Sequence, residues 1–299
     1  MNYGLMYDTL NFEQKSVFNK LINGENVFIT GNAGTGKSYL IKAYNEYCSL
    51  NGINLVKTAP TGVAANEIGG ATLHHQFKLK VGLDFKQPNK YPDFLDNTDV
   101  LLIDEISMVR VDIFDKLMQI LTLANNARKG KKAIQLILCG DFFQLAPVIS
   151  KDERPHLKDF YQCDIKDGYS FQSKYWNMYD VQLVNLTTVI RQSDYEFCNA
   201  LDMCKKGDSD CLKFIGKNCA KKEIEDAIWL CGKNITAAQK NEDGLRKING
   251  TLYSSQAKYE GNVTKADKLC DDVFNFKIGA KVVMLVNDST LVLSPLPVI

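Results

Sequence analysis

The sequence has no long hydrophobic run, and no apolar N-terminal segment precedes a small-residue cleavage site. No stretch approaches the roughly 18 uncharged apolar residues that a membrane-spanning helix needs. The chain also has almost no net charge, because 36 lysine and arginine residues balance 35 aspartate and glutamate residues. No global field therefore draws it to a membrane or to nucleic acid, and any affinity for a polyanion is local. We expect a soluble, intracellular protein with no membrane partner.

No CxxC pair occurs among the nine cysteines, although five of them fall within one segment. These five are Cys198, Cys204, Cys211, Cys219 and Cys231. Their gaps are irregular, whereas structural zinc sites usually contain closely spaced cysteine pairs. An odd number of cysteines also argues against a secreted disulfide framework. We therefore expect reduced thiols with a structural role.

Short apolar runs rich in β-branched residues alternate with helical patterns over the first 190 residues or so. The runs that predict strands are Val27–Thr30, Leu55–Thr58, Val100–Ile103 and Ile134–Cys139, and the helical patterns extend to about Leu50 and over 111–127. Continuous apolar strands separated by helices are typical of a parallel sheet that helices cover on both faces. We predict an α/β domain over 1–190, with a surface insertion at about 78–97 that has two prolines and no clear period.

Residues 191–299 are expected to form the second of two packed units, because 299 residues exceed the usual length of one domain. A helical pattern runs from Asp194 to a stop at Gly207, and Lys281–Val286 has the character of a buried strand. The ending, Ser289–Ile299, carries no charge. An apolar strand near a chain end usually needs a sheet to join, so either the fold closes there or the chain is incomplete.

The segment Gly31-Asn-Ala-Gly-Thr-Gly-Lys-Ser38 matches the pattern G-x-x-x-x-G-K-[ST] between a predicted strand and a predicted helix. Its glycines allow backbone N–H groups to wrap a phosphate, and the following helix directs its positive end at the same anion. Lys37 is expected to reach the β- and γ-phosphates and Ser38 to hold Mg²⁺. The predicted nucleotide-binding residues of the loop are Gly31, Gly34, Thr35, Gly36, Lys37 and Ser38.

A second strand end, Val100–Ser107, places two acids side by side. Asp104 is expected to bind the Mg²⁺ through water, and Glu105 to orient or deprotonate an attacking water. A GTPase would carry an Asn-Lys-x-Asp guanine reader after a strand. The nearest segment, Asn89-Lys-Tyr-Pro92, lacks the acid and lies in the insertion, so ATP is the predicted nucleotide.

A third strand end is followed by Gly140-Asp-Phe-Phe-Gln-Leu-Ala-Pro-Val148. These polar side chains are placed to register whether a γ-phosphate is present. A simple phosphate-transfer enzyme needs no such sensor, whereas a motor has to convert hydrolysis into movement. The segment therefore favours a motor over a small-molecule kinase.

Several further segments join these strand ends into an ordered series of motifs. The series comprises Leu10–Gln14, Asn26–Ser38, Ala59–Ala65, Gly70–Phe77, Leu102–Met108, Gly140–Val148 and Leu186–Gln192, with weaker similarity in Asn241–Tyr253 and Ile278–Asn287. It resembles the motifs of superfamily 1 DNA helicases, specifically the petite-integration-frequency (Pif-type) family. The resemblance implies a RecA-like P-loop NTPase domain, followed by a partial second RecA-like lobe. It also implies an ATP- and Mg²⁺-dependent helicase that moves 5′ to 3′ on single-stranded DNA, in DNA repair, recombination or telomere maintenance.

The resemblance assigns roles to three further side chains. It implies that Gln14 reads adenine, that Gln144 senses the γ-phosphate through water, and that Arg191 stabilises transition-state charge. A guanidinium from a neighbouring lobe can close on the phosphate only when the lobes approach, which would link hydrolysis to geometry. The alternatives are an ordinary helix-surface position for Gln14 and a surface ion pair for Arg191.

The predicted DNA contacts follow the second strand. Thr61 and Thr72 offer hydroxyl groups to phosphates, while His74 or His75 and Phe77 could contact sugars or stack on bases. Phe77 could equally belong to the core. The basic cluster Arg128-Lys-Gly-Lys-Lys132 precedes its strand, so we expect a solvated loop at the end of the sheet away from the nucleotide.

The resemblance weakens toward the end of the chain. After Asn287 the family reads Gly-Leu-Val-Asn-Gly or similar, and Asp288-Ser-Thr-Leu-Val-Leu-Ser294 departs from it. We therefore expect an unfinished second lobe, which a protein partner or a longer form of the chain would complete. The alternative to a working motor is a truncated or degenerate helicase that binds ATP or single-stranded DNA and regulates a partner.

Overall fold

The computed structural model describes residues 2–32, 34–80, 82–190, 194–218, 227–259 and 271–282. The chain divides into two compact units, Met1–Cys219 and Ala220–Ile299. The predicted boundary near residue 190 falls inside the first unit, and the division into two motor lobes stays a prediction. Within the described part of the chain, no helix combines the length and the apolar character that crossing a membrane requires.

The first unit contains one six-stranded sheet whose order is β3-β2-β4-β5-β1-β6, and every neighbouring pair of strands is parallel. Its strands are β1 (Val27–Gly31), β2 (Leu55–Ala59), β3 (Ala71–Thr72), β4 (Val100–Ile103), β5 (Gln135–Cys139) and β6 (Gln182–Leu186). Its helices are α1 (Leu5–Asp8), α2 (Phe12–Ile22), α3 (Lys37–Leu50), α4 (Gly62–Glu67), α5 (Leu73–Phe77), α6 (Val111–Ala127), α7 (Glu153–Tyr161), α8 (Tyr195–Lys205) and α9 (Cys211–Asn218). Three 3₁₀ turns are η1 (Asp93–Asn97), η2 (Ile106–Met108) and η3 (Ser170–Gln172). This architecture confirms the predicted α/β fold with a parallel sheet.

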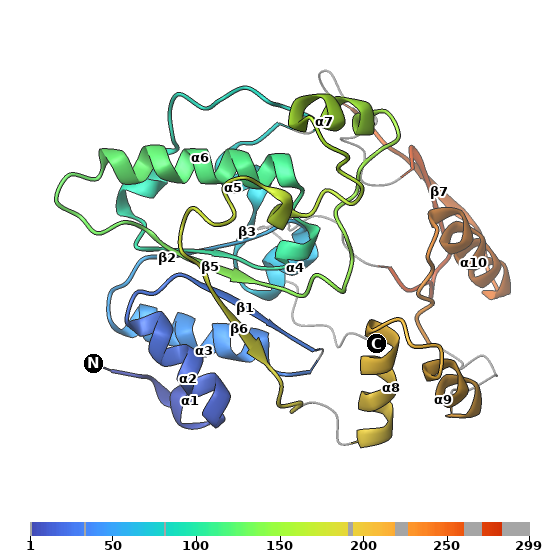
Figure 1. Cartoon of the computed structure of the whole chain (residues 1–299). Helices are drawn as coiled ribbons and strands as arrows, with labels where there is room; N and C mark the ends of the chain where they lie inside the picture. The colour runs from blue at the N-terminus through green and yellow to red at the C-terminus, as the bar shows by residue number, and fades with distance from the viewer. Residues whose placement is uncertain are drawn as a thin grey trace. The chain divides into compact units, whose positions relative to one another are not determined.

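Helices cover both faces of the sheet, with α2 and α3 on one side and α6 on the other (Figure 1). The strand β1 shows why its sequence is apolar throughout. Val27 and Ile29 pack in the core cluster with α2 and α3, whereas Phe28 belongs to the cluster that contains α6. Because successive strand residues point to opposite faces, a sheet covered on both sides needs apolar residues at every position.

The second unit contributes α10 (Asn234–Lys247) and a two-stranded antiparallel sheet of β7 (Tyr253–Gln256) and β8 (Val273–Phe276). Tyr253 lies opposite Phe276, and their rings stack with centroids 5.6 Å apart. The predicted strand Lys281–Val286 lies mostly outside the described residues, as does the whole of the ending from Ser289.

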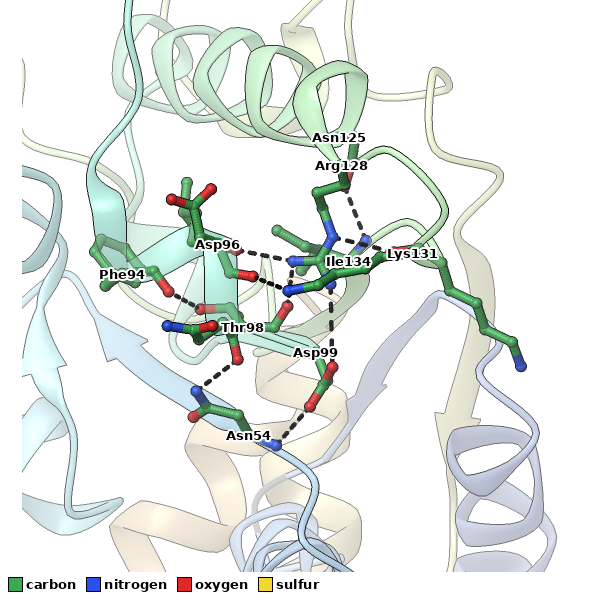
Figure 2. Close-up of polar contacts among 12 residues, drawn as sticks. Asn54, Phe94, Asp96, Thr98, Asp99, Asn125, Arg128, Lys131 and Ile134 are labelled. Carbon is green, nitrogen blue, oxygen red and sulfur yellow. Dashed lines mark hydrogen bonds and ion pairs between the residues drawn. The ribbon is translucent and has the colours of Figure 1, made fainter.

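The basic cluster Arg128–Lys132 lies at the amino ends of the strands, as predicted, but Arg128 is not solvated. Its side chain is only 5% exposed. Nη1 donates to the carbonyl oxygens of Leu95, at 2.8 Å, and Thr98, at 2.6 Å, and Lys131 donates to the carbonyl of Asp96 (Figure 2). The guanidinium therefore joins the segment before β4 to the loop after α6 through hydrogen bonds. Part of the loop that contains Arg128–Lys132 therefore has a structural role, which the sequence alone did not indicate.

Replacing Arg128 by alanine should lower the free energy of unfolding by about 2 to 4 kcal/mol, since two buried carbonyls lose a charged donor. Denaturant titration measures this change. Lys129→Ala, at the exposed neighbouring position, is the matched control and should shift stability by less than about 0.5 kcal/mol. Single-stranded DNA affinity should stay at the parent level in both variants. An Arg128→Ala chain of parent stability with weakened DNA binding would contradict the structural role.

Candidate nucleotide-binding site

The predicted phosphate loop lies between the end of β1 and the start of α3. The Lys37 ammonium folds back across the loop and donates to the carbonyl oxygens of Gly31, at 2.8 Å, and Asn32, at 3.3 Å. Thr35 is buried, and its hydroxyl donates to the carbonyl of Asn32 at 2.9 Å. Ser38 follows Lys37 as the second residue of α3. The loop is thus held in a turn with its lysine at the mouth, where phosphate oxygens can replace the two carbonyl acceptors.

Gly36 sits at the N-cap of α3 with a positive φ of 82°, in the left-handed region. A Cβ atom at this position would lie 2.4 Å from the side-chain nitrogen of Gln14. The backbone conformation therefore favours glycine here, and any larger residue would also displace the Gln14 side-chain amide. The phosphate loop therefore packs closely against α2 at Gly36 and Gln14.

Gln14 is buried, with 1% of its surface exposed. Its Oε1 accepts a hydrogen bond from the Asn11 backbone, and its Nε2 donates to the carbonyl of Gly36 at 3.2 Å. The alternative of an ordinary helix-surface residue is therefore wrong. In this structure Gln14 caps α2 and braces the phosphate loop, while its reading of adenine stays a prediction.

The carboxyl ends of β4 and β5 deliver the remaining polar groups beside the loop, because the sheet places β4, β5 and β1 side by side. Asp104 is 9% exposed and accepts the backbone N–H of Glu105 at 2.9 Å. Burial is the main cause that raises the pKa of both carboxyl groups, and the neighbouring Asp104 adds to the rise at Glu105. The charge of Lys37 opposes the rise at both acids. The nearby positive charge of Lys37 therefore does not fully compensate the two carboxylates for their burial.

A Mg²⁺ ion fits this donor set. The Asp104 carboxylate and the Ser38 hydroxyl are oxygen ligands of the kind that Mg²⁺ prefers, and the ion usually takes one or two protein ligands together with phosphate oxygens. A divalent cation would also supply the positive charge that two adjacent, partly buried acids need. Ser38 and Asp104 are therefore the residues that would hold it.

The backbone is strained where the acids meet. Glu105 has φ 50° and ψ 46°, a left-handed conformation that costs a non-glycine residue about 1 to 2 kcal/mol. Across from it, Gly140 has φ 154°, and a Cβ atom there would lie 2.9 Å from the backbone nitrogen of Ile106. The glycine therefore lets the end of β5 approach the turn that carries Glu105. Strain of this kind gathers at functional sites.

A cavity of about 220 Å³ opens beside Glu105. Its lining residues are Thr61, Val63, Ala64, Glu67, Glu105, Met108, Gln144 and Leu145. Gln144 is exposed, and its backbone N–H donates to the carbonyl of Asp141 at 2.9 Å. The structure thus brings the predicted water-activating acid, the predicted phosphate sensor and one predicted DNA contact to a single cavity.

Two of the predicted DNA contacts, Thr61 and Thr72, are the N-cap residues of α4 and α5. Thr61 and Thr72 accept the capping hydrogen bonds of α4 and α5 from the amides of Ala64 and His75, which leaves each hydroxyl proton able to donate to a phosphate. His74 is half-buried, and burial is the main cause that lowers its pKa, followed by the charge of Arg110.

Phe77 is 4% exposed and packs edge-on against Phe94 in the core, with ring centroids 5.3 Å apart. This position decides between the two predicted roles, because a base cannot stack on a ring that other side chains enclose. We therefore correct the predicted DNA contact at Phe77 and assign the residue to the core.

The segment after β6 makes two contacts that were not predicted from the sequence, one with the phosphate loop and one with α2. The amide of Ile190 donates to the carbonyl of Gly34 at 2.9 Å, and the carboxylate of Glu13 accepts the amides of Thr187 and Thr188. The hydrogen bond from the Thr187 hydroxyl is the main cause that lowers the pKa of Glu13. The segment leading toward Arg191 therefore lies against the loop, although Arg191 itself is outside the described residues.

A further unpredicted contact with the phosphate loop comes from α8. The Lys205 ammonium donates to the side-chain oxygen of Asn32, at 2.8 Å, and to the carboxylate of Asp141, at 3.1 Å. These partners lie 173 and 64 residues away in the sequence, so no local pattern signals the contact. The only sequence signal is a lysine at the end of a predicted helix.

Comparison with known proteins places this site in context. The model of the PIF1-like helicase family matches residues 9–216. The mouse ATP-dependent DNA helicase PIF1 is 33% identical over 295 residues, which cover 93% of this chain and 43% of the relative. The yeast (Saccharomyces cerevisiae) helicase RRM3 is 34% identical over 283 residues, covering 90% of this chain and 35% of the relative.

Solved structures give the same result. The crystal structure of Bacteroides Pif1 bound to single-stranded DNA matches with a TM-score of 0.78 and 31% identity, over 94% of this chain and 66% of that chain. Pif1 helicase from Candida albicans matches with a TM-score of 0.71 and 28% identity, over 90% of this chain and 63% of that chain. The chain spans less than half the length of these two curated relatives.

Proposed function

Because this chain belongs to the PIF1-like helicase family, we propose that it hydrolyses ATP and uses the energy to move on single-stranded DNA. One observation carries the proposal most strongly. The strands β4, β5 and β1 are neighbours, and their carboxyl ends bring the phosphate loop, the paired acids and the Gln144 turn to one edge of the sheet. A motor needs this convergence, because binding, hydrolysis and sensing of one triphosphate have to be coupled.

Each group at this edge has a chemical task. Lys37 binds the β- and γ-phosphates, and Ser38 and Asp104 hold Mg²⁺. When bound, the ion neutralises charge on the phosphate oxygens. Glu105 orients or deprotonates the attacking water, for which a partly buried carboxylate with a raised pKa is suited. Gln144 faces the same cavity as Glu105 and registers the γ-phosphate.

The roles of the remaining nucleotide- and DNA-contacting residues are inferred from membership of the family. Gln14 reads adenine once its hydrogen bond to Gly36 is exchanged, and Arg191 stabilises the transition state. The Bacteroides Pif1 structures were solved with single-stranded DNA and with ADP-AlF3, which supports the same ligand classes here. Thr61, Thr72 and His74 contact the strand, and movement is 5′ to 3′, the polarity implied by the resemblance.

Hydrolysis of ATP with and without single-stranded DNA tests the proposal. We expect several-fold stimulation by DNA, because only a motor couples strand binding to turnover. Lys37→Ala is the control for contaminating ATPases and should show no stimulated activity. Binding of ATP and DNA without stimulation would instead favour the non-motor regulator that acts through a partner protein.

A further inference from the structure

Lys205 joins three separate parts of the first unit. It is the last residue of α8, and its ammonium contacts Asn32 in the phosphate loop and Asp141 in the turn after β5. The ammonium also lies 4.8 Å from the centre of the Phe143 ring. Its side chain is 23% exposed and that of Asp141 only 5%. This is a partly desolvated ion pair beside the nucleotide site.

Asp141 shapes the turn that presents Gln144. One carboxylate oxygen accepts the backbone N–H of Phe143 at 3.1 Å, and the backbone carbonyl accepts the N–H of Gln144 at 2.9 Å. A buried carboxylate needs a compensating charge, and Lys205 provides one. The conformation of the Gln144 turn therefore depends on a residue of α8.

The same helix forms two side-chain hydrogen bonds with Asn32 in the phosphate loop. The side-chain oxygen of Asn32 accepts from Lys205, and its side-chain nitrogen donates to Asp202, one turn earlier on α8, at 3.3 Å. The backbone carbonyl of Asn32 meanwhile accepts from Lys37 and from the Thr35 hydroxyl. A shift of α8 would therefore act on the loop and on the sensor turn together.

We propose that Lys205 is a positioning residue that fixes the positions of Asn32 and Asp141 relative to each other. Through these contacts, α8, the phosphate loop and the Gln144 turn move together when nucleotide binds. The proposal deepens the proposed ATPase function and rests on it. In the sequence, α8 begins at Tyr195, four residues after Arg191, so the predicted arginine and Lys205 belong to neighbouring stretches of the chain. Lys205 acts through Asn32 and Asp141 and is not itself a catalytic residue.

The kinetic test compares Lys205→Ala, Lys205→Arg and Lys213→Ala in DNA-stimulated ATP hydrolysis. Lys213 is the matched control, since its side chain is 82% exposed on α9 and pairs only locally with Asp210 among the contacts of the described residues. Misplacing a reacting group by about 1 Å costs on the order of 100-fold, so Lys205→Ala should lower kcat by about 10- to 100-fold. KM for ATP should change much less, and Lys205→Arg should recover most of kcat.

Hydrogen exchange gives a readout that needs no activity. The amides of Phe143 and Gln144 should exchange faster in Lys205→Ala than in the parent and in Lys213→Ala. The double variant Lys205→Ala, Asp141→Asn removes the unpaired buried charge, so it should regain stability without regaining kcat. This variant keeps the test usable if Lys205→Ala folds poorly.

The outcomes separate the two proposals. An inactive parent chain contradicts the proposed function, while faster exchange at Phe143 and Gln144 still supports the positioning role. An active parent in which Lys205→Ala matches Lys213→Ala in kcat and exchange overturns the positioning role. A Lys205→Ala chain that loses stability but keeps parent kcat overturns it too, because that result describes a merely structural ion pair.

Discussion

Replacing Glu105 by glutamine should lower ATP turnover by about 10²- to 10⁴-fold, the range that a general base contributes, while affinity for ATP stays nearly unchanged. Glutamine keeps the size of the side chain but cannot take a proton from water. The carboxyl group of Glu105 lines the cavity with Gln144 and has a raised pKa, mainly through burial. Steady-state hydrolysis measures turnover, and equilibrium titration with a fluorescent ATP analogue measures affinity.

Glu67 provides a matched control for this substitution. It lines the same cavity, and its negative charge also raises the pKa of Glu105. Glu67→Gln therefore removes a neighbouring carboxylate without removing the base, and its turnover should remain close to that of the parent. If both variants lose turnover equally, the cavity needs negative charge in general and Glu105 has no special part in activating water.

Replacing Lys37 by alanine should abolish tight binding of ATP. In this structure its ammonium donates to two loop carbonyls, and the phosphates of ATP are expected to take their place. A hydrogen bond to a charged group contributes about 1.5 to 3 kcal/mol, so each lost bond should weaken affinity by about 10- to 150-fold. Titration with the same fluorescent analogue tests this expectation.

The control for Lys37→Ala is Lys42→Ala, which removes an exposed lysine from the same helix. Both variants should unfold at temperatures close to the parent, because α3 is anchored by its buried face, which includes Leu40, Ile41 and Tyr44. ATP should raise the unfolding temperature of the parent and of Lys42→Ala but not of Lys37→Ala. An equal rise in all three would place the triphosphate somewhere other than the loop.

The sheet could be predicted largely from the sequence because its central strands are buried on both faces. The bounds of β1, β2, β4 and β5 agree with the predicted runs to within a residue at each end. The edge strands β3 and β6 were missed for physical reasons. β3 has only two residues, and β6 exposes Gln182, Leu183 and Asn185, so neither shows a continuous apolar run.

The contiguous parts of the site were also predictable, because each motif ends a strand of the same sheet. The exposure of individual side chains and their long-range contacts could not be predicted. Sequence could not show that Arg128 is buried against carbonyls, that Phe77 lies in the core, or that Lys205 reaches across the sheet edge to Asn32. All three depend on segments that are distant in the chain and meet only after folding.

The structure of the chain bound to a non-hydrolysable ATP analogue and Mg²⁺ is the most direct measurement of whether one triphosphate lies between the converging strand ends. We predict that the terminal phosphate contacts the Lys37 ammonium and reaches Gln144 directly or through one water, with the ion held by Ser38 and Asp104. A nucleotide bound elsewhere, or a terminal phosphate remote from both Lys37 and Gln144, would contradict the proposed motor site.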